Sequence, residues 1–400
     1  MLEQRRGWCI AGLVLAVVLS GGSLAAQEVR LLAGGDIEWS RLPYRPTVAY
    51  LSDPGDWMAI PYLNLEENLD SIRVRIGRDE LDQTYRELHY RVPQPGIEFA
   101  SEEEEWRHSF RRTTELIRDA DVAFANLEMP ISDRAQVQQT ASVGATGFAD
   151  ALGWAGFDVI SLANNRLLDA ETTGLLDTMD ALDRAGVGWV GGGRDLEEAR
   201  RPYIIERNGV RMAFLAYTYG VSWVGVDGFA RPGGAGVMAM DPLLMREDIR
   251  RVRDQADVVI LSFHWGVGAR ESKDIPEAAR AFAREMIDEG ADIILGHHAH
   301  VPKGVEVHNG GVIFYSLSNF SFGHTHDYFI DNFAARVTLT ADGPRRVEVV
   351  PIAGLGLDVT QPYVLEGERA QRLLRDIREL SARLDTELTI EGDIGVITPR

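Results

Sequence analysis

Short apolar runs bounded by glycine or polar turn residues recur along the first three quarters of the chain, and amphipathic stretches separate them. The runs are rich in β-branched residues and shorter than most helices, so they predict buried strands. The five clearest runs are Val29–Gly35, Ala120–Leu127, Phe157–Ala163, Asp257–Phe263 and Ala291–His297. Because such strands alternate with helical stretches, the pattern predicts an α/β fold.

The amphipathic stretches predict helices with recognisable ends. Ser101 followed by Glu104 forms a capping box, so the four consecutive glutamates after Ser101 are expected to be an acidic first helical turn, with a calcium site as the alternative. Pro276 at a helix start and Gly290 just beyond its end delimit another helix. The expected helices are Glu102–Arg118, Thr173–Ala185, Leu243–Gln255 and Pro276–Glu289.

Residues 331–400 are expected to pack on the same domain as residues 27–330. Their pattern predicts two antiparallel strands joined by a turn at Ala341–Gly343, followed by an Arg/Glu-laced amphipathic helix that packs on the sheet. Residues 39–95 are rich in Trp, Tyr and Pro and weakly periodic, and are expected to form an insertion, either a lid or a subdomain. The expected strands of the later part are Gly311–Leu317, Phe333–Thr340 and Arg346–Ile352, and the expected helix is Gly367–Leu384.

Residues 1–26 predict a signal peptide. Arg5 and Arg6 precede an apolar stretch that ends in small residues before Gln27. The paired arginines also resemble a twin-arginine signal, so both that route and the ordinary secretory route stay open. An uncleaved N-terminal anchor is a third alternative. We expect the protein to be exported to the periplasm or the cell envelope.

Composition narrows the range of partners. The chain has a formal net charge of −20 and only two lysines, which argues against nucleic acid as a partner because phosphate contacts need a basic face. The single cysteine, Cys9, lies in the predicted signal peptide, so the exported part has no disulfide. Its stability must therefore come from its core, which a chain of 400 residues can build.

Polar residues that bind metals or handle protons follow all five predicted strands. Because ligands collect at the carboxyl ends of strands in α/β sheets, we expect these side chains at one edge. A mixed set of carboxylate, amide and imidazole groups suits Mn, Fe or Zn better than Mg or Ca. One or two such divalent ions are expected, and a pair about 3.5–4 Å apart can clamp both attacking and leaving oxygens. The expected ligands are Asp36, Glu128, Asn165, His264, His298 and His300.

Each of these residues also has an ordinary structural explanation. A lone His264 is more often a hydrogen-bonded core residue than a ligand, Asp36 can cap a helix, and Asn126 and Asn165 can serve as turn residues or helix caps. The coincidence of five strand ends favours the metal site over these separate explanations. Three further histidines in loop-like segments are expected to be solvated or peripheral, namely His308, His324 and His326.

These motifs resemble those of the CapA family of capsule or poly-γ-glutamate synthesis proteins, which belongs to the calcineurin-like metallophosphoesterase superfamily. The resemblance covers about Val29–Gly323, and the order and combination of its motifs are specific. The matching segments are Gly35-Asp36, Ala125–Pro130, Gly156–Asn165, Gly174–Thr178, His264–Gly266, Gly296–Val301 and Tyr315–Phe320.

The resemblance implies a four-layer α/β/β/α sandwich, and it places the six expected ligands at the family's metal positions. The family usually has histidine where this chain has Arg166, and that histidine assists phosphoryl transfer in the superfamily. Arginine does not exchange protons, although its guanidinium can bind phosphoryl oxygens. Ala299 stands for the usual proline and Ser318 for the usual glycine. The expected catalytic residues are Arg166, Asn126 and Asp169, and the expected substrate-binding residues are Asn164, Ser316 and Asn319.

Three functions stay open at this point. The first is metal-dependent phosphoester hydrolysis or transfer in the synthesis, attachment or release of an anionic surface polymer such as poly-γ-glutamate. The second is a non-catalytic scaffold that has lost its chemistry at Arg166 and serves a polymer synthase. The third is a metal-dependent enzyme acting on γ-glutamyl amide bonds. The expected partners are the anionic polymer or its precursor, together with membrane-bound synthase components.

Overall fold

The structure is a computed structural model that describes residues 27–39, 99–134, 142–220, 225–266, 273–323 and 329–399. The predicted signal peptide and nearly all of the predicted insertion at 39–95 lie outside these ranges. Within the described residues, no helix has the length and apolar character needed to cross a membrane.

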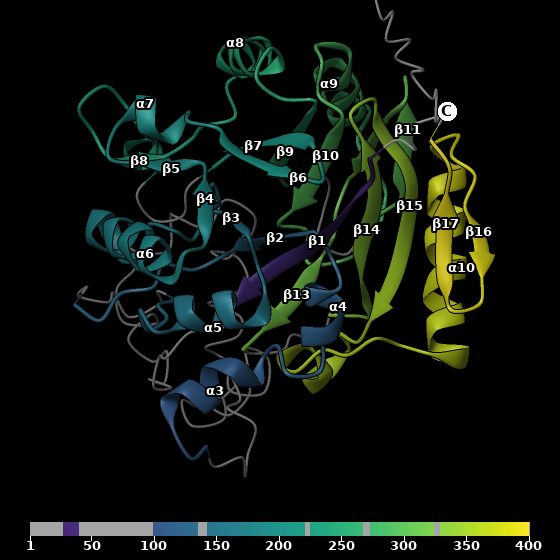
Figure 1. Ribbon diagram of the computed structural model, residues 1–400, viewed down its shortest axis with the longest axis horizontal. Coiled ribbons are helices and arrows are strands. Elements are labelled where there is room, and N and C mark those ends of the chain that lie inside the picture. Colours follow the sequence, from purple (N-terminus) through teal and green to yellow (C-terminus); the bar gives the residue numbers. More distant parts are fainter. Residues whose placement is uncertain are drawn as a thin grey trace, which may run out of the picture.

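One mixed sheet gathers strands from both ends of the chain, in the order β16-β17-β15-β14-β1-β2-β3-β4, with β13 beside β1 (Figure 1). Strands β1 to β4 run parallel, while β14 is antiparallel to both β1 and β15, so the predicted antiparallel pair is confirmed. The strands are β1 (Val29–Glu38), β2 (Val122–Leu127), β3 (Val159–Ser161), β4 (Gly188–Val190), β13 (Asn319–Phe322), β14 (Asn332–Thr340), β15 (Gly343–Ile352), β16 (Thr389–Glu391) and β17 (Ile394–Ile397).

A second sheet has the order β11-β12-β10-β9-β7-β6. Its central strands β7, β9, β10 and β12 are parallel, and the sequence analysis missed β6 and β7. These strands are β6 (Tyr203–Arg207), β7 (Val210–Thr218), β9 (Val258–His264), β10 (Ile293–His297), β11 (Val305–His308) and β12 (Gly311–Phe314). A small separate pair consists of β5 (Gly192–Gly193) and β8 (Gly236–Val237).

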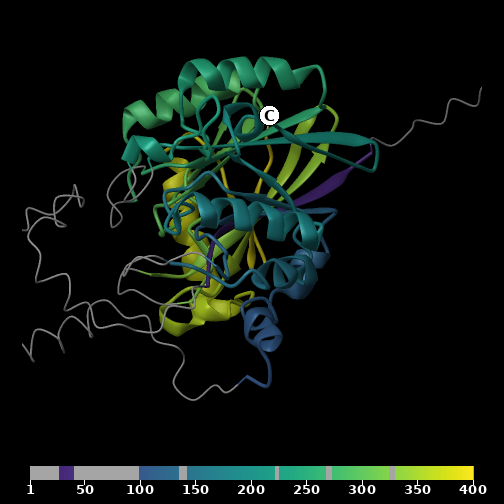
Figure 2. The same ribbon diagram turned by 90° about the vertical axis from the view of Figure 1, so that its left-hand side faces the viewer.

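The two sheets pack face to face through apolar side chains. Phe124 of β2 stacks on Phe214 of β7 with ring centroids 5.6 Å apart, at the centre of a buried cluster that draws residues from both sheets. Two more buried clusters join each sheet to its own helices. The helices of the second sheet lie at the top of the molecule and those of the first sheet lie below (Figures 1 and 2). The predicted four-layer α/β/β/α sandwich is therefore confirmed.

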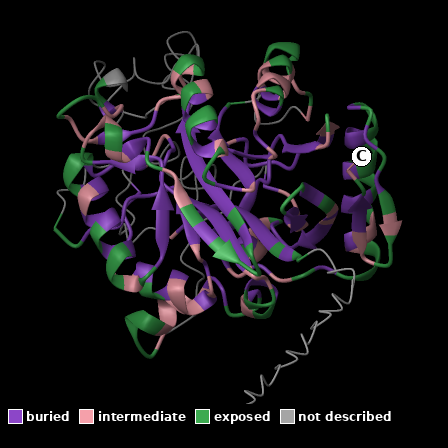
Figure 3. Ribbon diagram, turned by 45° about the horizontal axis from the view of Figure 1, so that its top comes forward, coloured by how far each residue is buried: buried purple, intermediate pink, exposed green. Residues whose placement is uncertain are grey.

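The helices each have an exposed face, whereas the central strands are buried (Figure 3). Helix α10 packs Leu374 and Ile377 into the core between the sheets, beside β16 and β17. The helices are α3 (Glu102–His108), α4 (Thr114–Arg118), α5 (Phe148–Ala155), α6 (Glu171–Ala185), α7 (Leu196–Ala199), α8 (Pro242–Arg253), α9 (Glu277–Asp288) and α10 (Gly367–Ala382), with short 3₁₀ turns η3 (Gly225–Gly228) and η4 (Gly356–Thr360).

One predicted helix was wrong in its extent. The stretch Glu102–Arg118 is split into α3 and α4, because Phe110 turns into the core and the hydroxyls of Thr113 and Thr114 both donate to its carbonyl oxygen. Such side-chain bonds compete with the helical pattern of backbone bonds. The cap of α3 is as expected, since the Ser101 hydroxyl accepts from the Glu104 N–H at 3.2 Å.

Gly35 lets β1 pass directly against the turn before β13. A Cβ built on Gly35 would lie 2.0 Å from the carbonyl oxygen of Ser318, and the next N–H, that of Asp36, donates to the same oxygen at 2.8 Å. The absence of a side chain at Gly35 therefore sets where Asp36 is placed.

We expect Gly35→Ala to lower the free energy of unfolding by about 1–3 kcal/mol, because the backbone of Ser318 must move to admit the methyl group. Urea denaturation measures the change. The matched control is Gly220→Ala, where a Cβ would meet nothing within 4 Å, and this variant is expected to stay within about 0.5 kcal/mol of wild type. Equal stability of the two variants would contradict the proposed crowding at Gly35.

Candidate metal centre

The expected ligands come together, but they come from both sheets and not from one edge of a single sheet. Asp36 lies near the end of β1, while Glu128 and Asn165 follow β2 and β3 of the same sheet. His264 ends β9 of the second sheet, and the His-x-His segment follows β10. The carboxyl ends of the parallel strands in the two sheets meet because the sheets are packed face to face.

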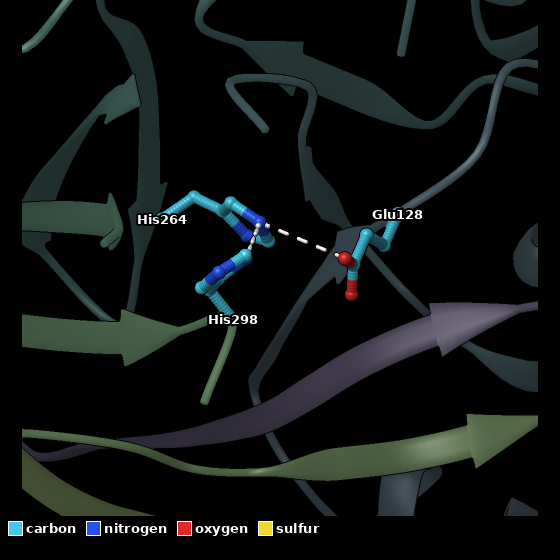
Figure 4. Close-up of side chains that lie close together, drawn as sticks. All are labelled: Glu128, His264 and His298. Atoms are coloured by element: carbon cyan, nitrogen blue, oxygen red, sulfur yellow. Dashed lines mark hydrogen bonds and ion pairs between the residues drawn. The ribbon is translucent and has the colours of Figure 1, made fainter. Parts of the chain in front are cut away.

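The first group of ligand atoms centres on Nε2 of His264, which is fully buried. That nitrogen lies 2.7 Å from Oδ1 of Asn165, 3.0 Å from Nδ1 of His298 and 3.7 Å from Oε1 of Glu128. Figure 4 shows both imidazoles turned toward the glutamate carboxylate. Glu128, His264 and His298 each offer an atom within 4.8 Å of the others, which is close enough for one ion to bind all three.

The second group consists of Asp36, Glu128 and His300, again with ligand atoms within 4.8 Å of one another. Nε2 of His300 lies 3.8 Å from Oε1 of Glu128, and its Nδ1 lies 3.9 Å from Oδ2 of Asp36. Because Glu128 belongs to both groups, the geometry suits two neighbouring cations that share one carboxylate.

The protonation chemistry of the cluster fits a cation. Nε2 of His264 can donate one hydrogen at most, yet three lone-pair-bearing atoms surround it. Burial, and then the charge of His298, lower the pKa of His264 well below its usual value, which favours the neutral imidazole that metals bind. Burial raises the pKa of Asp36, but the contact with His297 and the nearby His264 and His300 together lower it by more, so this carboxyl stays ionised.

Asp36 is held by groups from both sheets. Its Oδ1 accepts from the Asn126 side-chain amide at 2.8 Å, and its Oδ2 accepts from the backbone N–H of His298 at 3.0 Å. Nδ1 of His297, a buried residue that sequence analysis passed over, lies 3.1 Å from Oδ1. His297 could have been noticed because it ends an apolar run, but its neighbours in the His-x-His pair drew the assignment. We infer that His297 orients the carboxylate of Asp36.

Two asparagines form a chain behind Asp36. The Asn164 side-chain amide donates to Oδ1 of Asn126 at 3.2 Å and to the carbonyl oxygen of Leu127 at 2.8 Å. Its own Oδ1 accepts from the N–H groups of Arg166 and Leu167. Asn164 thus holds the turn after β3 against β2, and its expected contact with substrate stays a prediction. A direct catalytic role for Asn126 also stays a prediction.

The other two expected substrate-binding residues are also buried: Asn319 begins β13, and Ser316 lies three residues before it. Oδ1 of Asn319 lies 2.7 Å from Nδ1 of His300, so Asn319 fixes the orientation of that imidazole. The hydroxyl of Ser316 accepts from the N–H of Ser318 at 3.1 Å. These contacts shape the site, and binding of substrate by either residue stays a prediction.

Arg166 lies beside the centre in the turn after β3. Its side chain is 31% exposed, and Nη1 donates to Oδ2 of Asp169 at 3.3 Å. The Asp169 carboxylate is buried and also accepts from the N–H of Ser142. Asp169 therefore positions the guanidinium, and the catalytic roles expected for both residues stay predictions.

The backbone around the histidines adopts unusual conformations. His298 and His300 have φ angles of +85° and +56°, and Ser318 has +62°. Non-glycine residues rarely take such values, which cost on the order of 1–3 kcal/mol each and cluster at functional sites. At Ser318 the cost is offset by a bond from its hydroxyl to Oδ1 of Asn332 at 2.6 Å. This bond explains how serine can stand where the family usually has glycine.

Because the backbone of His298 is in the left-handed region, glycine should be tolerated there better than alanine. In metal-free protein, we expect His298→Gly to be more stable than His298→Ala by about 1 kcal/mol, measured by urea denaturation. His297 is the control position, because it lies in β10 and is not among the left-handed residues. At position 297 the alanine variant should be more stable than the glycine variant by about 0.5–1 kcal/mol, since glycine weakens a strand. The same order at both positions would contradict the strain.

Comparison with known proteins shows which family the chain belongs to. Residues 80–324 match the model of the family described as "Bacterial capsule synthesis protein PGA_cap". The chain is 30% identical over 253 residues to the capsule biosynthesis protein CapA of Bacillus anthracis, covering 61% of this chain and 60% of that protein. It is 36% identical over 198 residues to the PGA biosynthesis protein CapA of Bacillus subtilis, covering 49% and 50%.

Likeness to solved structures is distant. A putative 5'-nucleotidase from Staphylococcus aureus aligns over 70% of this chain and 52% of its own, with 11% identity and a TM-score of 0.39. A similarity this low carries no information about the activity of this chain. The family match, in contrast, covers more than half of the chain and includes every residue of the centre except Asp36. The chain therefore belongs to the bacterial capsule synthesis protein family, PGA_cap, as its CapA-like motifs predicted.

Proposed function

We propose that this protein is an exported metal-dependent enzyme that hydrolyses or transfers a phosphoester during synthesis of a capsule or poly-γ-glutamate-type polymer. The observation that carries the proposal is the convergence of two ligand groups on one shared carboxylate, that of Glu128. The family supplies the biological process, because its printed description and the names of both relatives refer to capsule or PGA synthesis. The curated relatives are matched over only 60% and 50% of their length, so their activity as whole proteins is carried over as a proposal.

The residues present fit one or two divalent transition-metal ions, namely Mn, Fe or Zn. His264, His298 and Asn165 with Glu128 would hold one ion, and Asp36 and His300 with the same Glu128 would hold the other. When bound, such ions supply Lewis acidity toward a phosphoryl oxygen and make water a stronger acid. The mixture of imidazole and oxygen donors favours these metals over Mg and Ca.

The chain itself would contribute order and positive charge. Asn126 and His297 hold Asp36 in one orientation, and Asn319 does the same for His300. Arg166, held by Asp169, would bind phosphoryl oxygens as charge develops on them. Because the chain as a whole carries a charge of −20, an anionic polymer or precursor would be attracted only locally, by the ions and this arginine.

A scaffold role is the second candidate, and Arg166 favours it. An arginine cannot act as the proton donor that the family's usual histidine would provide. In that case the protein would bind metal but serve a membrane-bound synthase as a partner. Action on γ-glutamyl amide bonds with the same ions is a third candidate, which an assay on that polymer would detect.

Metal content tests the centre directly. We expect one or two transition-metal ions per chain, and a sharp loss in His264→Ala and in His298→Ala, because each variant removes a ligand atom from the first group. Elemental analysis of the purified protein measures the content. His308→Ala is the control, since His308 contacts Asp288 at the end of α9. Unchanged metal in both ligand variants would refute the site.

Arg166 decides between enzyme and scaffold. A positioned acid contributes about 10²–10⁴-fold to rate, so wild type is expected to be a weak phosphatase and Arg166→His a faster one, with metal content unchanged. Arg166→Ala should fall below wild type if the guanidinium binds the transition state. Turnover of a generic phosphoester measures all three.

The control for this series is Arg345→Ala. Arg345 makes a comparable pair with Asp342, three residues away, in the hairpin between β14 and β15. The Arg345→Ala variant should leave phosphoester turnover unchanged. Inactivity of wild type, Arg166→His and Arg166→Ala at full metal occupancy would favour the scaffold. A vigorous wild type that loses activity in Arg166→His would show that this arginine itself serves catalysis.

A further inference from the structure

A sixth strand end reaches the centre, and it belongs to β7, which sequence analysis missed. Thr218, the last residue of β7, is paired with His264 at the end of β9. Tyr219 follows, and its N–H donates to the carbonyl oxygen of His264 at 3.2 Å. The backbone of Tyr219 is therefore fixed to the same residue around which the first ligand group is arranged.

The side chain of Tyr219 reaches the other imidazole of that group. Its hydroxyl oxygen lies 3.1 Å from Nε2 of His298, and the two rings meet edge to face with centroids 5.3 Å apart. Gly266, just after β9, leaves room for the phenol, since a Cβ there would lie 3.2 Å from the hydroxyl oxygen. Tyr219 is 44% exposed, so it forms the outer wall of the centre on this side.

The two nitrogens of His298 therefore have different neighbours. Nδ1 faces Nε2 of His264 at 3.0 Å, on the side of the ligand group, and Nε2 faces Tyr219. A neutral imidazole that presents the lone pair of Nδ1 to a cation carries its hydrogen on Nε2. That N–H would then donate to the hydroxyl oxygen of Tyr219. The hydroxyl oxygen of Tyr219 can accept this hydrogen, and the contact would hold the ring in the orientation in which Nδ1 faces the ligand group.

Tyr219 adds to the restraints on His298, whose backbone N–H already donates to Asp36. The backbone of His298 is in the left-handed region, with a φ angle of +85°, and the residue as a whole is half-buried, whereas His264 and His300 are buried. A contact at Nε2 would help to keep the imidazole of such a residue in one rotamer. In metal sites generally, such outer partners are worth 10–100-fold in affinity.

We propose that Tyr219 is a positioning residue for the metal centre, acting through His298 by holding its Nε2–H. The proposal rests on the proposed function in one respect, which is that the centre binds metal. It adds a residue that lies outside the six expected ligands, and it assigns Nδ1 of His298 as the metal-binding atom.

Titration of the metal-free protein with cobalt(II) tests the proposal. Tyr219→Phe removes only the hydroxyl and is expected to weaken cobalt binding by about 10–100-fold. The visible spectrum at saturating cobalt should also change, because the geometry of one ligand is released, while the melting temperature of the metal-free protein stays the same. Tyr203→Phe, on β6 of the same sheet, is the matched control and should bind cobalt as wild type does.

A double-mutant cycle shows whether the effect passes through His298. In the His298→Ala background, Tyr219→Phe should cause no further loss of cobalt affinity, since the group that it positions is gone. An equal loss in both backgrounds would overturn the proposal. So would unchanged affinity and spectrum in Tyr219→Phe when wild type binds cobalt, and in that case the metal centre itself would stand. Wild type that binds no cobalt would overturn the proposed function together with this inference.

Discussion

The carboxylate of Asp36 is the point at which the two sheets are joined at their functional end. It sits on β1 of the first sheet and accepts the backbone N–H of His298, which follows β10 of the second sheet. The side chain is fully buried, so its charge must be met by hydrogen bonds and by positive charge nearby. Asn126 and His297 meet part of this requirement. A cation, as proposed, would meet the remainder.

The same requirement applies to Glu128, which stands between the two ligand groups. Two buried carboxylates and three imidazoles bring lone pairs together at one place, and a cation would be surrounded by them. In a protein that binds metal here, part of the binding free energy would stabilise the fold, because the ligand set is assembled only when both sheets are in place. The left-handed conformations of the His-x-His segment belong to this arrangement, since they turn both imidazoles into the groups.

Around this centre, the chain departs from its family in ways that the structure partly explains. Ser318 adopts a left-handed conformation, which glycine would take at less cost, and its hydroxyl donates to Asn332. Arg166 is different, because its ion pair with Asp169 orders the guanidinium without restoring a proton donor. The expected ligands thus lie together, whereas the histidine that usually assists phosphoryl transfer is replaced by Arg166. This description fits both a phosphoester enzyme of altered mechanism and a metal-binding scaffold. We propose the enzyme.

Much of this protein could be predicted from its sequence, because apolar runs and the polar residues after them are local features. The strands that deliver Asp36, Glu128 and His264, the cap of α3 and the α/β class all follow from such patterns. The four layers came from family resemblance, which also placed the six expected ligands at the family's metal positions. What sequence patterns could not supply was the pairing of distant segments. Local periodicity did not show that the ligands would come from two sheets, or that the stretch after α3 would break where Phe110 enters the core.

The residues that support the ligands were decided by tertiary structure alone. Tyr219 and Asn319 carry no local mark that distinguishes a supporting residue from a core or loop residue, and Asn319 had been expected to bind substrate. His297 ends an apolar run, but that position alone does not separate a supporting residue from a ligand. Their roles depend on which atoms lie within about 3 Å after two sheets have packed together. Sequence determined which chemical groups stand at the strand ends. Packing of the apolar faces determined which of those groups meet, because hydrophobic burial sets the distance between sheets while hydrogen bonds act only at contact.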